Sequence, residues 1–372
     1  MKLFPHLIII LIISSCSSNR TNKKTLKKID EIDFSVGFAP SVIKHFAYNG
    51  EEYVGFADFK SFKKIKLFNI NARSQYSFSI KDIIKNELVY INGLSFSSPD
   101  SIALLSSSGT SKLFIVNKKG EVIYKKDYSF LKGQETALYP PIEFKGNQIR
   151  VGLSYYGKEN TPALSKEYYD NFFKDKNESY IMMSDTLFRG HTLPTLQMDS
   201  LYMRFIPKSV NNTEMNHLLY LDTKNIFYST YSDSVYEYDL NGQLKEVFSI
   251  KSTKTKTKVN PISISEMMMD KNNLFIKNIE DNSYIALLLW DKFRSVYYAI
   301  IPGKKMSAKK TPFTILVLDE KFETLDEFTM NPDKYYFTRF FYYPCFVGKK
   351  GLYIQNQNKD VKNTNYSIFT YE

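Results

Sequence analysis

The chain contains 372 residues, which is long enough to bury a large core and to form one domain or two. Tyrosine and phenylalanine are abundant, with 28 and 29 residues, and aromatic residues make up 16% of the chain, a composition that favours strands over helices. The net charge of +11 is carried almost entirely by scattered lysines rather than arginines, which argues against a nucleic-acid-binding protein. We therefore expect an all-β protein.

Residues 1–15 are predicted to be a signal peptide rather than part of the fold. Lys2 precedes an apolar run at 7–13 that is too short to span a membrane as a helix. The sequence Ile-Ser-Ser-Cys at 13–16 follows directly and resembles a bacterial lipobox, in which the cysteine is acylated and becomes the mature N-terminus. We predict a lipoprotein signal peptide at 1–15, lipidation of Cys16 and a polar tether at 16–28. An ordinary secretory peptide is the alternative. Cys345, the other cysteine, is expected to be a buried apolar side chain.

Strand patterns over residues 29–372 predict a six-bladed β-propeller. In the clearest stretch, apolar and polar residues alternate at 236–240 and again at 244–250, and Asn241-Gly242 between them favours a type I′ turn. The last group of strands is one short, so we expect the strand at 29–34 to pair with it and close the ring. The third blade is expected from strands at 139–144, 149–155, 180–184 and 187–192. The six blades are predicted at 42–80, 88–128, 139–192, 217–250, 284–329 and 343–371.

The connections between these strands differ in length according to the face of the disc on which they lie. Connections from strand one to two and from three to four lie on one face, the short-loop face, and all are short. Connections from strand two to three and from blade to blade lie on the other face, the long-loop face, and include 156–179, 251–282 and 331–342. Binding commonly uses long loops on a rigid scaffold. We predict that the long-loop face binds a partner and points away from the membrane, because the tether would leave from the short-loop face.

Several segments of the chain resemble segments of a known family. They are the lipobox at 13–16, SVYEYDLNGQLKEV at 234–247, LLLWDKFRSVYYAII at 287–301, ILVLDEKFETLDEF at 315–328 and YPCFVGKKGLYI at 343–354. In these segments the chain resembles six-bladed, TolB-like β-propeller lipoproteins of unknown function from Bacteroides-type bacteria. The resemblance implies the propeller fold and an envelope location, and it implies no chemistry. An arginine that such proteins carry after the turn of the fifth blade is replaced here by Ala299, so no role is carried over for it.

No motif points to a catalytic residue or a metal site, and we predict no cofactor. The sequence contains no HExxH, no CxxC, no acidic calcium loop and no nucleophile elbow. His45 and His217 fall on predicted innermost strands of opposite blades, where they could face each other across the axial channel and hold a metal or move protons. The alternative is that both histidines pack against neighbouring side chains. A propeller hydrolase with a metal in the channel is therefore the second candidate, after a non-catalytic binding module.

Aromatic residues gather in two of the long connections and are the candidate binding residues. Their rings can stack on sugars or anchor a protein partner, with an arginine as a polar contact. Alternatively, these aromatic residues pack the long connections against the propeller. We expect a monomer that binds a protein or glycan but no nucleic acid. We also expect its lipid to hold it in the outer membrane, facing the periplasm, because no acidic cluster follows the lipobox. The candidates are Tyr156, Tyr168, Tyr169 and Phe172 in the first group and Tyr336, Arg339 and Phe341 in the second.

Overall fold

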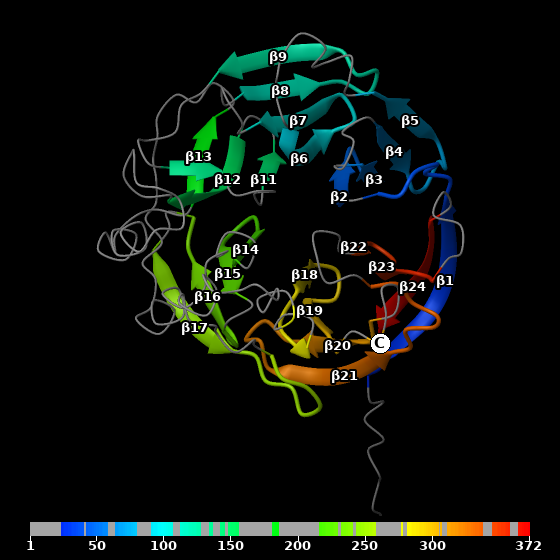
Figure 1. The fold of residues 1–372 in the computed structure, drawn as a ribbon, viewed down its shortest axis with the longest axis vertical. Helices are drawn as coiled ribbons and strands as arrows, with labels where there is room; N and C mark the ends of the chain where they lie inside the picture. Colours follow the sequence, from blue (N-terminus) through cyan, green and yellow to red (C-terminus); the bar gives the residue numbers. More distant parts are fainter. Residues whose placement is uncertain are drawn as a thin grey trace, which may run out of the picture.

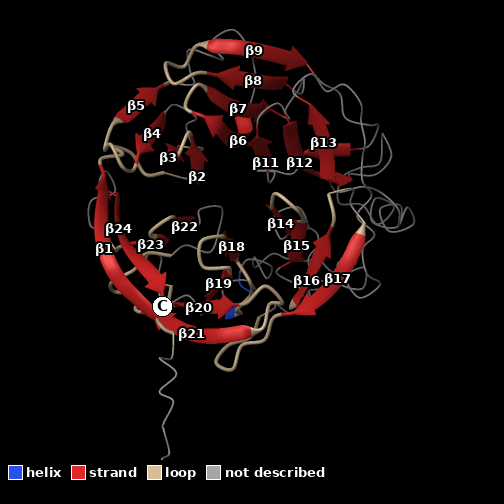
Figure 2. Ribbon diagram, turned by 180° about the vertical axis from the view of Figure 1, so that it is seen from behind, coloured by secondary structure: helices blue, strands red, loops and turns tan. Residues whose placement is uncertain are grey.

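The structure of the protein is a computed structural model. Strands and loops make up nearly all of the residues that it describes (Figure 2). No helix among these residues is long and apolar enough to cross a membrane. The described residues are 24–40, 42–58, 64–79, 91–106, 112–127, 134–136, 142–145, 148–155, 181–185, 216–229, 232–240, 243–257, 277, 281–304, 306, 311–337, 344–357 and 364–372.

The described strands form six antiparallel sheets of four strands, which stand around a common centre (Figure 1). This arrangement confirms the all-β propeller. Five of the sheets are regular, with each strand hydrogen-bonded to the next in one ladder. These five consist of β2 (Val42–Tyr48), β3 (Glu51–Ala57), β4 (Ile65–Asn69) and β5 (Gln75–Phe78); β6 (Ile91–Ser98), β7 (Ser101–Ser106), β8 (Lys112–Val116) and β9 (Val122–Asp127); β14 (Asn216–Tyr220), β15 (Asn225–Ser229), β16 (Ser234–Tyr238) and β17 (Leu244–Ser249); β18 (Leu287–Asp291), β19 (Val296–Pro302), β20 (Phe313–Leu318) and β21 (Thr324–Met330); and β22 (Cys345–Gly348), β23 (Gly351–Gln355), β24 (Thr364–Tyr371) and β1 (Leu26–Phe34).

The remaining sheet departs from this pattern. It contains β10 (Gln134–Thr136), β11 (Ile142–Lys145), β12 (Gln148–Tyr155) and β13 (Ile181–Asp185), and β12 pairs with all three other strands. The prediction of six regular blades is therefore corrected, because the described residues form five and one irregular sheet. The physical reason is strand length: β13 pairs with β12 only as far as Gly152, and β10 pairs with the remaining end of β12 at 153–155. The predicted strand at 187–192 lies outside the described residues.

The core lies in layers between neighbouring sheets rather than in one central mass. Side chains alternate along each strand, so a sheet buries apolar residues on both faces. On β4, Ile65 and Leu67 pack toward β6–β9, whereas Phe68 packs toward the sheet that contains β1 and β24. β2 lies against β6 and β22, and β18 lies against β14 and β22, at the centre of the ring (Figure 1).

The connections fall into the two predicted sets. The links β2–β3, β4–β5, β6–β7, β8–β9, β11–β12, β14–β15, β16–β17, β18–β19, β20–β21 and β22–β23 contain two to five residues each. In an antiparallel meander these links lie at one end of the strands, and the other links lie at the opposite end. The opposite set contains all the longer links, among them 35–41, 58–64, 79–90, 303–312 and 331–344, together with two short ones at 107–111 and 230–233. The predicted difference between a short-loop face and a long-loop face is confirmed in this part of the chain.

The two ends of the chain close the ring, as the sequence predicted. β1 pairs antiparallel with β24 from Leu26↔Tyr371 to Phe34↔Thr364, with a bulge at Ile29. The strand begins three residues before the predicted start at 29, so the last part of the predicted tether belongs to β1. Phe34, at the end of β1, is 2% exposed and its ring lies 5.3 Å from Phe56 and 5.2 Å from Phe68. Hydrogen bonds therefore join the two ends of the chain within the last sheet, and an aromatic cluster joins this sheet to the first.

Arg294, in the turn between β18 and β19, connects the last sheet to its other neighbour, the sheet β18–β21. Its guanidinium donates to Asp291 Oδ2 at 3.1 Å, to Thr370 Oγ1 at 2.7 Å and to the carbonyl of Lys350 at 2.9 Å. Asp291 is fully buried at the end of β18 and has this arginine as its ion-pair partner. Because the planar guanidinium reaches several acceptors at once, it ties β18–β21 to the turn between β22 and β23 and to β24.

Candidate functional site

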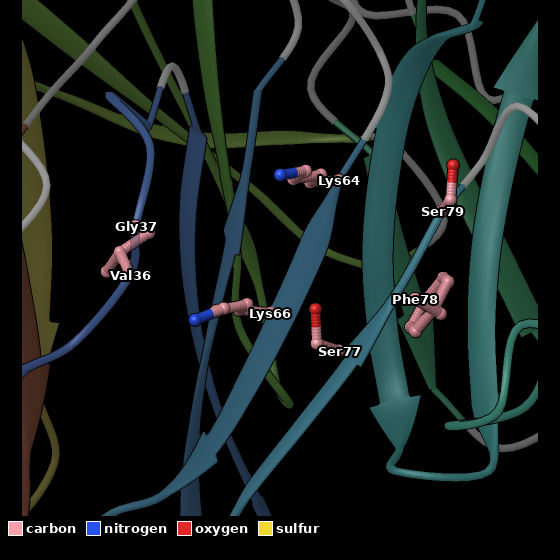
Figure 3. A pocket seen from close by; sticks show the side chains of 7 residues that line it. All are labelled: Val36, Gly37, Lys64, Lys66, Ser77, Phe78 and Ser79. Atoms are coloured by element: carbon pink, nitrogen blue, oxygen red, sulfur yellow. The ribbon is translucent and has the colours of Figure 1, made fainter.

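A cavity opens between the link from β1 to β2 and one face of the first sheet, β2–β5. Its volume is about 290 Å³. Figure 3 shows the ammonium groups of Lys64 and Lys66 directed toward the β1–β2 link, with Ser77 beside them on the next strand. The lining residues are Val36, Gly37, Lys64, Lys66, Ser77, Phe78 and Ser79.

The pleat of β4 and β5 gathers the polar residues on one side. Lys66 on β4 is the direct cross-strand partner of Ser77 on β5. Lys64 and Ser79 stand two residues further along, so alternation places them on the same face as Lys66 and Ser77. The intervening pair, Ile65 and Phe78, belongs to the core shared with β6–β9. One face of the β4–β5 hairpin thus belongs to the apolar core, and the opposite face is polar near the end of β5.

The β1–β2 link forms the opposite wall. The Val36 N–H donates to the carbonyl of Phe34 at 2.8 Å, which turns the chain tightly at the end of β1. Gly37 has a φ of +76°, a conformation that favours glycine. Lys66 Nζ donates to the carbonyl of Ser35 at 2.7 Å, so this ammonium group is held against the link.

The cavity lies at the long-loop face. Lys64 follows the β3–β4 link, Ser79 begins the connection from β5 to β6, and Gly37 lies in the link between β1 and β2. All three segments belong to the long set of connections. The turns at the other end of the same strands, 49–50 and 70–74, belong to the short set. The cavity therefore opens on the face for which the sequence predicted binding.

The chemistry of the lining is cationic and hydroxylic. Two lysines and two serines line the space, and none of its described lining residues carries a carboxylate. Lysines two residues apart on one face of a strand repel each other, and a carboxylate nearby would normally offset this repulsion. The arrangement can donate several hydrogen bonds to a negatively charged group.

His45, one of the two predicted channel residues, lies on β2 between the first and last sheets. Its Nε2 is 3.0 Å from Glu52 Oε1, and its ring stacks on Phe346 of β22 at 5.7 Å. Glu52 Oε1 also accepts a hydrogen bond from the Lys349 N–H at 2.7 Å. Burial would raise the pKa of Glu52, but the hydrogen bonds from His45 and Lys349 outweigh it and hold that pKa below its usual value. His45 therefore belongs to a polar contact that joins two sheets.

His217, the other predicted channel residue, lies on β14. Its ring stacks on its cross-strand partner Tyr228 at 4.8 Å. The hydroxyl of Tyr228 accepts a hydrogen bond from the Leu288 N–H at 3.0 Å, which directs this pair toward the sheet β18–β21. Burial lowers the pKa of His217 to about 4, so the ring is neutral near neutral pH. Each histidine ring thus stacks on an aromatic ring, that of a neighbouring sheet for His45 and that of its own sheet for His217, as the packing alternative expects. A shared metal remains a prediction.

Among the residues with a described placement, no group of three or more histidine, cysteine, aspartate or glutamate side chains could hold a metal ion. Of the predicted binding residues, Tyr336 is half-buried in the link after β21. Its N–H donates to the carbonyl of Gln355 at 2.9 Å, and burial raises the pKa of its hydroxyl. The neighbouring Phe337 is buried and stacks on Phe313 at 5.0 Å. Cys16, Tyr156, Tyr168, Tyr169, Phe172, Arg339 and Phe341 lie outside the described residues.

Sequence reasoning missed the residues of the cavity. A signal was present, because Lys64 and Lys66 alternate on one strand and Ser77 and Ser79 alternate on the next. Alternation alone is typical of any half-exposed hairpin, however, and only the register shows that the two pairs share a face. The contribution of Gly37 depends on the position of the β1–β2 link, which no local pattern reveals.

Comparison with known proteins supports the fold. No family model matches the chain, and no curated protein matches it. Among solved structures, a member of the DUF4221 family from Bacteroides vulgatus is similar with a TM-score of 0.68 and 18% identity, over 94% of this chain and 99% of that one. A protein described as exported, from Bacteroides fragilis, has a TM-score of 0.49 and 10% identity, over 96% and 97% of the two chains. The first likeness shows a shared fold, and the second is too weak to add an argument.

Proposed function

We propose that the protein is a lipid-anchored propeller of the cell envelope that binds a protein or glycan partner through its long-loop face, without catalysis. In this proposal the irregular sheet β10–β13 serves as the sixth blade. The observation that carries the proposal is the position of the Lys64–Lys66 cavity on the long-loop face of a closed ring. A rigid scaffold with its long connections and a cavity on one face is typical of binding proteins.

The proposed anchor is consistent with the path of β1. This strand runs from Leu26 to Phe34 and enters the β1–β2 link, which belongs to the long-loop face. Its start therefore lies at the short-loop face, where the Thr25 N–H donates to the carbonyl of Glu372 at 2.6 Å. A tether that leaves from this end would turn the long-loop face away from the membrane. Labelling cells with an alkyne fatty acid tests the anchor: wild-type protein should carry the label and Cys16→Ala should not. A labelled Cys16→Ala variant would contradict it.

The binding proposal is tested by crosslinking from the two faces. A photo-crosslinking amino acid is placed at Lys64 on the long-loop face or, as a matched control, at Lys119 in the short turn between β8 and β9. Both positions are exposed lysines, so the substitution removes the same charge. We expect crosslinked products from position 64 in intact envelopes, and few from position 119. Equal yields from both positions, or products from position 119 alone, would contradict binding through the long-loop face.

A further inference from the structure

We infer that the Lys64–Lys66 cavity binds an oxyanion, a phosphate or carboxylate group, that is carried on a sugar. This inference rests on the proposed function and specifies the chemistry of the ligand. It depends on three features of the cavity: a change from apolar to cationic residues on one face of β4, the presence of lysines but no carboxylates among its described lining residues, and its size.

The change along β4 is unusual for a face that lies between two sheets. Phe68 on this face is 6% exposed and contacts the ring of Phe34 at 5.2 Å. The next residues on the same face are Lys66 and then Lys64, at the long-loop end. The aromatic layer between the first and last sheets therefore ends in two ammonium groups. Long side chains of this kind can extend into solvent. The ammonium group of Lys66 instead donates a hydrogen bond to the carbonyl of Ser35 in the β1–β2 link.

The bond from Lys66 positions a cation without neutralising it. An ammonium group has three N–H donors, and the carbonyl of Ser35 uses one of them. The remaining donors of Lys66 and those of Lys64 face a space whose described lining residues carry no negative charge. Charge-assisted hydrogen bonds to an oxyanion would use these donors and would offset the repulsion between the two cations. The hydroxyl of Ser77, directly across the strand pair from Lys66, lies on the same face.

The size of the cavity indicates more than a bare ion. A water molecule occupies about 30 Å³ of liquid volume, and the cavity measures about 290 Å³. This is near the lower limit for small-molecule sites and leaves room for a ring beside the charged group. The additional lining consists of Ser77, Ser79, Val36, Phe78 and Gly37, and the absence of a side chain at Gly37 allows close approach. Serine hydroxyls beside apolar surface from Val36 and Phe78 suit a sugar ring, which carries hydroxyls on its edge and C–H groups on its faces.

The test is a titration of the mature protein with glucose 6-phosphate, glucuronate, glucose and inorganic phosphate. We expect both acidic sugars to bind at least about tenfold more tightly than glucose, because hydrogen bonds to charged groups are strong. They should also bind more tightly than inorganic phosphate. Lys64→Gln should weaken binding of glucose 6-phosphate about tenfold or more, and Lys119→Gln, the same change on the short-loop face, should leave it unchanged. Added salt should weaken binding to the wild-type protein.

Each part of the inference has its own contradicting result. Equal affinity for glucose and glucose 6-phosphate would overturn the oxyanion, and equal affinity for inorganic phosphate and glucose 6-phosphate would overturn the sugar. Undiminished binding to Lys64→Gln and to Lys66→Gln would place the ligand elsewhere. Lys66→Gln also removes the bond to Ser35, so its thermal midpoint is measured beside that of Lys64→Gln. Crosslinking from position 64 without any binding of acidic sugars would leave the proposed function standing and overturn the inference alone.

Discussion

The substitution Phe34→Ala tests how the ring is closed. Phe34 is 2% exposed at the end of β1, and its ring contacts Phe56, Phe68 and Tyr366 at centroid distances of 5.3, 5.2 and 5.7 Å. Replacing a buried phenylalanine with alanine costs about 3–5 kcal/mol, which includes the cavity left behind. Aromatic pairs contribute about 0.5–1.5 kcal/mol each beyond the area that they bury. With three such pairs, we expect a loss near the upper end, roughly 4–5 kcal/mol.

The matched control is Ile29→Ala on the same strand. Ile29 is 50% exposed and occupies the bulge between Lys28 and Asp30, so its loss should change stability by less than about 0.5 kcal/mol. Urea unfolding followed by the fluorescence of Trp290 measures both variants against the wild type, and equal slopes show that the midpoints report stability. If Phe34→Ala unfolds at the same urea concentration as Ile29→Ala, closure by β1 does not hold the ring together.

Three further results are expected. Glu52→Gln should lower the free energy of unfolding at neutral pH by about 1–3 kcal/mol, because a neutral amide replaces the carboxylate that accepts the Lys349 N–H and contacts His45 Nε2. The pKa of Glu52 is held below its ordinary 4.5, so this stabilisation is present above that value and is lost as pH falls through the lower folded pKa. Urea unfolding across that range should show the difference from the wild type shrinking in acid, and a constant difference would contradict the role. Arg294→Ala should cost about 3–5 kcal/mol because it strands the buried carboxylate of Asp291, and Arg294→Lys should rescue only part of this loss. Urea unfolding checks both variants, and full rescue by lysine would refute the multiple contacts of the guanidinium. Cys345 is 5% exposed and burial raises the pKa of its thiol, so a thiol reagent should label it in urea but not in the native protein. Rapid native labelling would show that the last sheet opens.

Much of the fold could be predicted from the sequence because each strand carries its own signal. Alternation along 244–250 predicted β17 closely, and the strand missing from the last blade predicted the pairing of β1 with β24. The start of β1 was predicted late, because Leu26, Lys27 and Lys28 follow a polar segment and resemble it in composition. The irregular sheet could not be predicted, because its order depends on how far β13 extends along β12, and the sequence does not specify that distance.

The sites were harder to predict because they depend on contacts between sheets. The sequence placed His45 and His217 on inner strands, β2 and β14, and the structure agrees. It could not indicate that His45 would meet Glu52 and Phe346, or that His217 would stack on Tyr228, because those contacts depend on register and on sheet packing. The cationic cavity was missed for the same reason. Aromatic residues attracted attention in the sequence, whereas the described cavity is built from lysine and serine.

The most direct test of the central claim is a crystal structure of the mature protein with glucose 6-phosphate. We expect the phosphate between the ammonium groups of Lys64 and Lys66, with the sugar ring beside Gly37 and the protein otherwise closed by β1 against β24. A ligand bound at the centre of the ring near His45, or on the short-loop face, would contradict the account.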